Sequence, residues 1–232
     1  MKVSICIATY NGEKYIGEQL SSILSQINSN DEIIISDDSS SDNTLSIIKS
    51  FNDPRISIYN STARHPSFNF ENALNKATGE IIFLSDQDDV WLENKVCIMS
   101  KALENADLVL SDCYVGDEKL KILHSSFFEL YKCNIGWLKN ILVNSYIGCS
   151  IAFHRKILEK ALPFPKGKLL LHDYWIGMVA ETYFSPKLIP DKLIIYRRHA
   201  SNASPTTGVS NNSLLKKILI RFVILKGLFL NR

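Results

Sequence analysis

The sequence predicts an α/β fold in which a mainly parallel central sheet is flanked by helices. Short apolar or β-branched runs predict strands over residues 2–8, 32–36, 55–59, 81–85 and 108–111. Segments with helical spacing separate most of these runs and cover residues 13–26, 42–51, 68–77 and 93–105. This alternation is typical of a parallel sheet with crossover helices. Residues 33–35 and 81–84 have no polar face, which indicates central strands covered on both sides.

The alternation changes after residue 114, although no internal repeat marks a separate unit. In this part we expect a strand over 148–153, helices over 154–162 and 173–183, and a strand over 188–196. We therefore predict one domain over residues 1–204, with halves at 1–114 and 115–204. Residues 201–213 are rich in Ser, Asn and Thr and predict a linker. Residues 205–232 would then hold this linker and a C-terminal helix that is both apolar and basic.

Charge is distributed unevenly along the chain. The net charge of the 232 residues is +2, but residues 213–232 carry five Lys or Arg side chains and no acid. The remainder has 21 basic and 24 acidic residues, and a mildly acidic body argues against nucleic acid as a partner. The five cysteines form no CxxC pair, and a predicted strand rather than a leader pattern opens the sequence. We therefore expect free thiols and a cytoplasmic location.

Polar side chains follow three of the predicted strands at the points where the strands end. They are Thr9, Tyr10 and Asn11 after the first strand, Asp37 and Asp38 after the second, and residues 86–89 (Asp-Gln-Asp-Asp) after the fourth. Because ligands of open α/β sheets bind outside the carboxyl ends of the strands, we expect these segments to converge on one site. Asp37 and Asp38 fit a turn and helix cap equally well, so both interpretations stay open for them.

The carboxylates of Asp86, Asp88 and Asp89 are the strongest chemical signal in the sequence. Three acids within four residues repel one another unless a cation or hydrogen-bond donors offset their charge. Oxygen ligands suit Mg²⁺ or Mn²⁺ better than zinc, and such ions bind through one or two carboxylates plus substrate phosphates. The sequence therefore predicts a divalent cation and a diphosphate substrate. No GxGxxG follows the first strand and no GxxxxGK[ST] occurs, so a dinucleotide fold and a P-loop are excluded.

Several segments together resemble glycosyltransferase family 2. These are "ATYNGEKYIGEQLSSILSQ", "IIISDDSSSDNT" and "FLSDQDDVW", followed by "YIGCSIAFHR", "LLHDYWIG" and "YRRHASNAS", so the resemblance extends to about residue 204. The form DQDDVW is similar to bacterial rhamnosyltransferase-like members. The resemblance implies a GT-A fold and an inverting glycosyltransferase that depends on a divalent cation.

The resemblance also implies roles for single residues. Nucleotide-sugar contacts would come from Thr9, Tyr10, Asn11, Asp38, Asp86 and Gln87, with Asp86 on the ribose. Asp88 would bind the metal that bridges the diphosphate, His199 would close over the diphosphate or metal, and Asp89 would support the loop. Asp173 would be the catalytic base, although an Asp at a helix start is also a common cap.

The chain departs from the family pattern at one place near the donor, and it offers candidate residues for the acceptor side. Many family members carry an Arg-Asn pair before the fourth strand, whereas residues 67–72 here read Ser-Phe-Asn-Phe-Glu-Asn and contain no Arg. The acceptor side would be supported by His172 and by the aromatic side chains Trp91 and Trp175, of which Trp175 adjoins Asp173. Aromatic residues are also the usual filling of a core, which is the alternative interpretation for both tryptophans.

The C-terminal segment 213–232 has apolar residues at most positions, interrupted by Lys216, Lys217, Arg221 and Lys226. Cations in the middle of a segment disfavour a membrane-spanning helix. An interfacial helix on anionic lipid fits better, and packing on the body or on a second subunit is the alternative. With the first interpretation the protein would work at the inner face of the cell membrane.

The sequence thus predicts transfer of a sugar from a nucleoside diphosphate sugar, with dTDP-rhamnose and UDP-hexoses as candidate donors. The expected acceptor is a glycan or a lipid-linked saccharide in the synthesis of cell-surface polysaccharide. One rival enzyme is a sugar nucleotidyltransferase, which calls for a Gly-rich basic loop after the first strand, where only Gly12 and Lys14 occur. The other rival is a non-catalytic module that binds nucleotide sugars or glycans and needs no base at Asp173.

Overall fold

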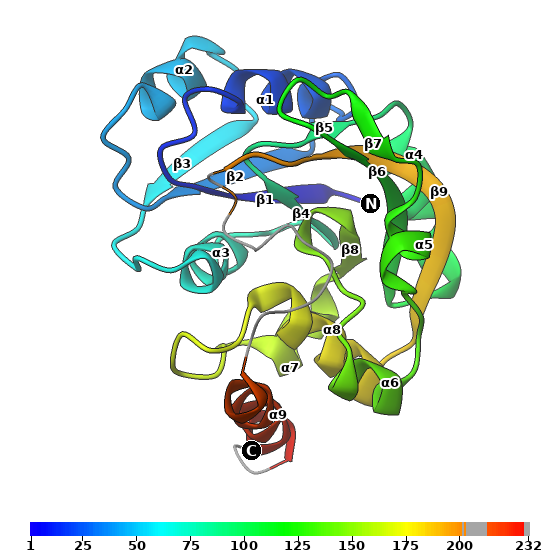
Figure 1. Ribbon diagram of the computed structural model, residues 1–232. Coiled ribbons are helices and arrows are strands. Elements are labelled where there is room, and N and C mark those ends of the chain that lie inside the picture. Colours follow the sequence, from blue (N-terminus) through cyan, green and yellow to red (C-terminus); the bar gives the residue numbers. More distant parts are fainter. Residues whose placement is uncertain (201, 203–212, 230–232) are drawn as a thin grey trace.

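A computed structural model describes residues 1–200, 202 and 213–229, and it confirms the α/β class (Figure 1). Within these residues one sheet has the strand order β3-β2-β1-β4-β8-β6-β9-β5, and β7 pairs with β6. Helices cover both faces of the sheet, which is strongly curled in its second half (Figure 1). The expected linker lies, except for Asn202 and Ser213, outside the described residues.

The first half of the chain follows the predicted alternation closely. Its elements are β1 (Val3–Thr9), α1 (Ile16–Leu24), β2 (Glu32–Asp37), α2 (Thr44–Ser50), β3 (Ile56–Asn60), α3 (Pro66–Leu74), β4 (Ile81–Asp86), β5 (Val90–Trp91), α4 (Lys95–Ala102) and a 3-10 turn, η1 (Leu103–Asn105). The short strand β5 was not predicted. Strands β3, β2, β1 and β4 pair in parallel, as expected for strands joined by crossover helices.

The second half contains shorter and more varied elements. They are β6 (Leu108–Gly116), β7 (Ile122–His124), α5 (Phe127–Tyr131), α6 (Trp137–Leu142), η2 (Gly148–Ser150), β8 (Ile151–His154), η3 (Arg155–Ile157), α7 (Leu158–Ala161), α8 (His172–Tyr183), β9 (Pro186–Arg197) and α9 (Leu214–Phe229). Here the sheet is mixed, because β8 runs antiparallel to β4 and β6 while β9 runs parallel to β6. The expected parallel arrangement therefore holds throughout β3, β2, β1 and β4, whereas parallel and antiparallel pairs are mixed in the rest of the sheet.

Alternate residues of the central strands fill two separate core layers. Ile5 and Ile7 pack with α1, α2 and α4 on one face, whereas Cys6 packs with α3, α7, α8 and α9 on the other. This alternation explains the strands without a polar face, since both of their sides are covered. The two layers hold the carboxyl ends of β1, β2 and β4 side by side, next to the start of α8.

Candidate active site

A cavity of about 710 Å³ opens at the carboxyl ends of β1, β2 and β4. Eight of the residues expected at the site from the sequence line it. They are Thr9, Tyr10, Asp38, Asp86, Gln87, Asp88, His172 and Asp173. The predicted convergence of separate segments on one site is therefore confirmed, and α8 adds the wall that carries Asp173.

Reciprocal hydrogen bonds fix the loops after β1 and β4 to each other. The backbone N–H of Tyr10 donates to Gln87 Oε1 at 3.0 Å, and Gln87 Nε2 donates to the Tyr10 carbonyl at 3.0 Å. Gly12 lies directly behind, because a Cβ there would sit 2.3 Å from Gln87 Oε1. Because Gly12 has no side chain, the Gln87 side chain can approach its backbone closely.

The loop after β2 is held by a second set of contacts. Thr9 Oγ1 donates to Asp37 Oδ1 at 2.8 Å, and the Asp38 carboxylate accepts the backbone N–H of Arg64 at 3.0 Å. Asp37 also accepts the Ser40 N–H at 2.9 Å, so it has the turn-forming role that the sequence left open. Asp38 instead reaches the cavity.

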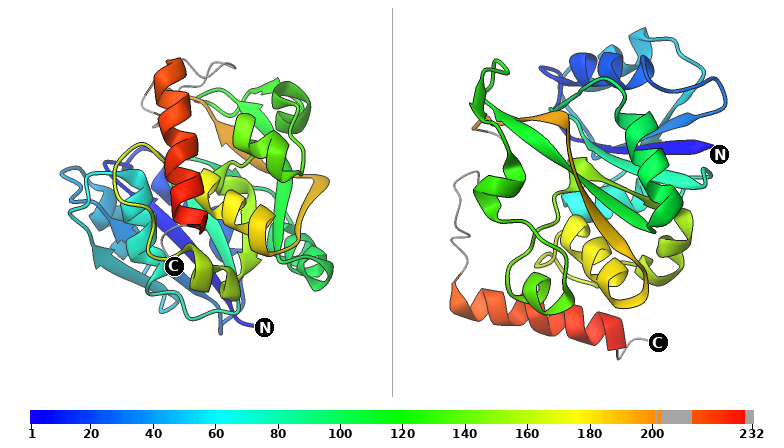
Figure 2. Two further views of the ribbon diagram at one scale, coloured as in Figure 1. Left: turned by 90° about the horizontal axis from the view of Figure 1, so that it is seen from below. Right: turned by 90° about the vertical axis from the view of Figure 1, so that its right-hand side faces the viewer.

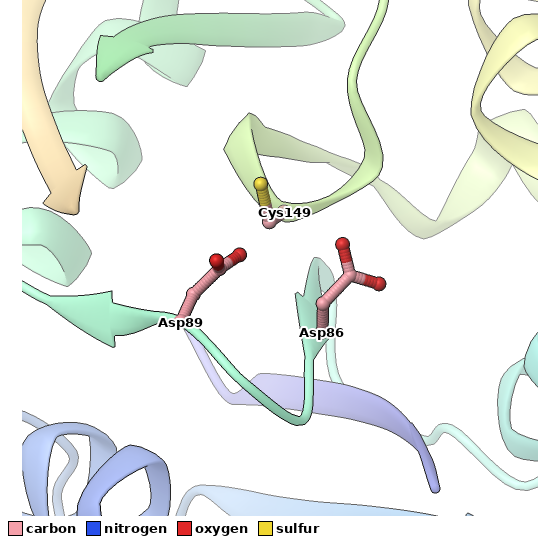
Figure 3. Close-up of side chains that lie close together, drawn as sticks. All are labelled: Asp86, Asp89 and Cys149. Carbon is pink, nitrogen blue, oxygen red and sulfur yellow. The ribbon is translucent and has the colours of Figure 1, made fainter. Parts of the chain in front are cut away.

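Asp86 and Asp89 point toward Cys149 from the two ends of the acidic loop (Figure 3). Their nearest carboxylate oxygens and the Cys149 sulfur lie within 4.8 Å of one another. Burial, followed by the charges of Asp89 and Asp88, raises the pKa of Asp86 well above its ordinary value. Burial and the charge of Asp88 likewise raise the pKa of Asp89 to about 7. The crowding inferred from the sequence is therefore present in the structure.

Lys95 places a buried positive charge behind this acidic loop. Its Nζ donates to the Cys149 carbonyl at 2.7 Å and lies 4.4 Å from the centre of the Trp91 ring. Burial lowers the pKa of Lys95 to about 8, while the neighbouring groups Cys149 and Asp89 act in the opposite direction. The ammonium group therefore offsets part of the charge of Asp86 and Asp89.

Asp88 is oriented toward the end of β9. Its Oδ2 lies 2.8 Å from His199 Nε2 and 3.3 Å from Asn202 Nδ2. The buried Arg197 side chain donates through Nε to the Asp88 carbonyl at 2.7 Å, and the Arg197 backbone N–H donates to Asp89 Oδ1 at 2.9 Å. The two predicted metal-binding residues, Asp88 and His199, are thus in direct contact, and Arg197 fixes the loop that carries Asp88.

Two groups of side chains contain suitable ligand atoms for a cation, and the two groups differ in chemistry. In the cluster of Asp86, Asp89 and Cys149, burial raises the pKa of the Cys149 thiol well above its ordinary value, which leaves it protonated and unsuited to a hard ion. Asp88 offers a carboxylate oxygen and His199 an imidazole nitrogen, next to the cavity that would supply water or phosphate oxygens. The second group fits Mg²⁺ or Mn²⁺ better.

Asp173 is the second residue of α8 and lies half-buried in the cavity wall. Leu171 holds the N-cap position, and Asp173 Oδ1 accepts the N–H of its neighbour Tyr174 at 2.7 Å. Asp173 is therefore not the cap of this helix. Burial raises its pKa to about 6, although the backbone N–H groups of Tyr174 and Gly148 act in the opposite direction. Asp173 is a carboxylate at neutral pH with more than ordinary basicity.

Other predicted residues lie away from the cavity. Asn11 connects two loops, because its N–H donates to Ser40 Oγ and its Oδ1 accepts the Ser41 N–H, each at 2.9 Å. Trp91 and Trp175 are each only 3% exposed, and Trp175 donates to the Ala161 carbonyl at 2.7 Å. The structure does not support an acceptor surface at either tryptophan, because both belong to the core. Asp89 and His199 do not line the cavity themselves, although His199 contacts the lining residue Asp88.

Several contributors to the site were not predicted from the sequence. Lys95 and Arg197 stabilise the acidic loop from below, and Asn69 and Arg64 line the cavity. Lys95 follows the acidic motif by six positions, and Arg197 belongs to the motif that contains His199, so both lay close to recognised signals. His172 was predicted as a site residue, but its protonation state was not. The His172 ring stacks on the Phe70 ring, with the two ring centres 4.0 Å apart. Burial lowers the pKa of His172 to about 3, so its ring is neutral.

Comparison with known proteins agrees with this arrangement of strands and acids. The model of "Glycosyl transferase family 2" matches residues 4–162. The chain belongs to glycosyltransferase family 2. The family match ends before Asp173 and His199. The roles considered for these two residues therefore come from the sequence resemblance and from their positions in the structure.

Curated relatives of this chain include bacterial proteins that are named as glycosyltransferases. The Escherichia coli UDP-Glc:alpha-D-GlcNAc-diphosphoundecaprenol beta-1,3-glucosyltransferase WfaP is 29% identical over 94% of this chain and 87% of its own length. The Shigella flexneri dTDP-rhamnosyl transferase RfbG is 41% identical over 39% of this chain and 34% of its own length. The matched part makes up 66% of a glycosyltransferase from Nostoc, so this chain spans less than the full length of several relatives.

Solved structures include chains with a similar fold. S. aureus TarS 1-349 in complex with UDP-GlcNAc superimposes with a TM-score of 0.76 over 97% of this chain and 67% of the solved chain, at 19% identity. This similarity confirms the expected GT-A fold of the family 2 chain.

Proposed function

We propose that this chain transfers a sugar from a nucleoside diphosphate sugar to a hydroxyl group of a saccharide, with inversion at the anomeric carbon. The observation that carries the proposal is the position of Asp173. It lines the same cavity as Asp86 and Asp88, and its pKa of about 6 combines ionisation at neutral pH with increased basicity. A binding module has no need for such a group.

In the proposed reaction the acceptor oxygen bonds to the anomeric carbon while its proton passes to the Asp173 carboxylate. The bond between the anomeric carbon and the phosphate oxygen breaks, and its electron pair leaves with the nucleoside diphosphate. Thr9, Tyr10 and Asp38 would contact the nucleobase side, as the sequence predicts. Asp86 and Gln87 would contact the ribose.

Asp88 and His199 would hold the divalent cation, and a bound cation would offset the charge of the departing diphosphate. The ionisable side chains among the described lining residues support this requirement. They comprise four aspartates, the two histidines His65 and His172, and the single guanidinium of Arg64. Such a cavity repels a diphosphate unless a cation enters with it.

The names of two relatives support a proposal for the donor and acceptor classes. One relative is named for UDP-glucose and an acceptor on diphosphoundecaprenol, and another for dTDP-rhamnose. We propose that the donor here is a UDP-hexose or dTDP-rhamnose and that the acceptor is a lipid-linked saccharide. His172 would stand beside the reacting groups, since it adjoins Asp173 and, among the described residues, neither of its ring nitrogens has a hydrogen-bond partner.

The variant Asp173→Asn tests the proposal. Asn keeps the size and the hydrogen bond from the Tyr174 N–H but accepts no proton, so turnover should fall by a factor on the order of 10² to 10⁴. Donor affinity and melting temperature should stay near those of the parent. Release of UDP or dTDP is measured with a panel of donors and an acceptor that the parent is shown to glycosylate.

Asp42→Asn is the matched control, because Asp42 accepts the Thr44 N–H at 3.0 Å outside the cavity and undergoes the same chemical change. It should keep the parent's turnover. Turnover of Asp173→Asn within a few-fold of the parent would remove Asp173 as the base. Donor binding without sugar transfer by the parent would favour a non-catalytic module, and release of pyrophosphate from sugar phosphate and nucleotide would favour a nucleotidyltransferase.

A further inference from the structure

The C-terminal helix α9 has one face that packs on the body. Ile224 is fully buried, and a Cβ at Gly227 would lie 2.7 Å from the Trp175 ring, so the helix backbone rests directly on this tryptophan. The Arg221 guanidinium donates to the carbonyls of Ile141 at 2.9 Å and Leu142 at 2.6 Å. Packing on the body, which was the alternative interpretation for this segment, therefore holds for this face of α9.

The opposite face of α9 is apolar and exposed. Its side chains recur at spacings of three and four residues, which places them in one row along the helix. This outer stripe consists of Leu215, Ile218, Phe222, Leu225 and Phe229. Phe222 at its centre is 60% exposed. Within the described part of the chain nothing covers the stripe.

Helix α6 extends the apolar surface. It lies beside α9 at the same end of the molecule, and Arg221 joins its last carbonyls to α9 (Figure 2). Leu138, Leu142 and Val143 at α6 are all more than 60% exposed. The outer stripe and these three residues form what we call the α6–α9 surface, which exceeds the scattered single apolar residues normal for a protein surface.

The charged side chains of α6 and α9 are of one sign. Lys216 and Lys226 on α9 and Lys139 on α6 are exposed, and neither helix contains an acid. Lys217 is less exposed, because its spacing aligns it with the packed residues Ile224 and Leu228. A second copy of α9 would bring lysines against lysines, whereas stable helix pairs place opposite charges beside the apolar seam. Anionic phospholipid satisfies both requirements at once, because it accepts apolar side chains below its headgroups and attracts lysines at them.

We propose that the α6–α9 surface docks this protein on a membrane that contains anionic phospholipid. No helix among the described residues is long and apolar enough to cross a membrane. The α6–α9 surface would instead lie flat on the bilayer with the outer stripe inserted. Since α9 packs against α8, which carries Asp173, docking would hold the cavity wall close to the headgroups. This last consequence depends on the proposed function, because it gives a lipid-linked acceptor a short path to Asp173.

Sedimentation with vesicles tests the docking independently of activity. The full chain is mixed with vesicles of phosphatidylcholine alone or with 30% phosphatidylglycerol, at low salt and at 0.5 M NaCl. We expect at least tenfold stronger partition to the anionic vesicles at low salt, and a large loss at high salt. Phe222→Glu should reduce the partition at least tenfold. Leu123→Glu is the matched control, because Leu123 is an exposed residue of β7 and should tolerate the same change without loss.

A double variant, Lys216→Ala with Lys226→Ala, tests the contribution of the lysines to binding separately from that of the outer stripe. It should lose most of the preference for phosphatidylglycerol while its melting temperature stays that of the parent. Equal partition of Phe222→Glu and the parent would overturn the proposal. A dimer that Phe222→Glu dissociates in sedimentation velocity, together with no vesicle binding by the parent, would also overturn it and assign the stripe to a second copy. Loss of sugar transfer in Asp173→Asn leaves these binding results unaffected.

Discussion

At the scale of single residues, the site is a set of acids whose pKa values are raised by their surroundings. Asp173 has a pKa of about 6 because it is buried, whereas the crowded Asp86 and Asp89 are raised by burial and by neighbouring carboxylates. The positive charge of Lys95 partly offsets the increase in the pKa values of Asp86 and Asp89.

The pKa of Asp173 leads to a prediction about pH. The base works only when ionised, so kcat/KM should decrease about tenfold per pH unit below about 6 and level off above it. With the pKa of an ordinary Asp, the decrease in kcat/KM would occur below about pH 4 instead. The measurement is kcat/KM from pH 4.5 to 8.5 at saturating Mn²⁺, with circular dichroism at each pH to exclude unfolding. A rate that stays constant down to pH 5 would contradict the assignment of Asp173.

Much of the site was predictable from the sequence because its acids follow strands directly. The carboxyl ends of parallel strands meet, so Thr9, Asp38 and Asp86 had to come together once the strands were recognised. Arg197 and Lys95 could not be assigned in this way. Arg197 meets Asp89 over a separation of 108 residues, and Lys95 meets Cys149 over 54, and no local pattern encodes such contacts.

At the scale of elements, the first half was predictable because its helices and strands are long enough to show their periodicity. Strand β5 has two residues and α5 has five, which is too short for either pattern. The tryptophans were ambiguous for another reason, since an aromatic side chain suits a core and a sugar-binding surface equally well. Only burial decided that Trp91 and Trp175 belong to the core.

Helix α8, which carries Asp173, depends on a close approach that gives an element-scale prediction. A Cβ at Gly177 would lie 2.2 Å from the ring of the buried Tyr146, whose hydroxyl donates to Glu181 Oε1 at 3.0 Å. Gly177→Ala should therefore lower the free energy of unfolding by about 1–3 kcal/mol, despite the better helix propensity of Ala. Urea denaturation measures this change.

Gly17→Ala in α1 is the matched control for the same substitution. Its Cβ would meet Ile47 Cγ2 at 3.5 Å, which is an ordinary contact. Here only the helix propensity changes, so the variant should be about 0.5–1 kcal/mol more stable than the parent. If both variants gained stability, the packing of Tyr146 on α8 would be looser than described.

At the scale of the whole molecule, the cavity lies where the parallel half of the sheet meets the mixed half. The acidic loop comes from the first half, and Asp173, His199 and Asn202 come from the second. A ligand that contacts both halves should therefore stabilise the fold as a unit, by an amount set by its affinity.

The charge of the cavity predicts that donor and cation bind together. UDP or dTDP should bind at least tenfold more tightly with Mn²⁺ than in EDTA, because the lining carboxylates repel a diphosphate alone. Isothermal titration calorimetry measures the affinities. Asp88→Asn should remove most of the difference, and Asp191→Asn, an exposed change on β9, should retain it. Equal affinities for the parent with Mn²⁺ and in EDTA would remove the cation from the site.

Strand β9 has a consequence for the order in which the chain becomes structured during synthesis. It lies between β6 and β5 in the sheet, although it is the last strand in sequence. Until residues 186–197 have left the ribosome, β6 lacks a neighbour on that side and β5 has no partner, so both present unpaired backbone groups. Arg197, at the end of the same strand, reaches the Asp88 loop only afterwards. The nascent chain therefore gains its last sheet pairing and its ordered acidic loop in one step, and before that step it depends on protection from aggregation.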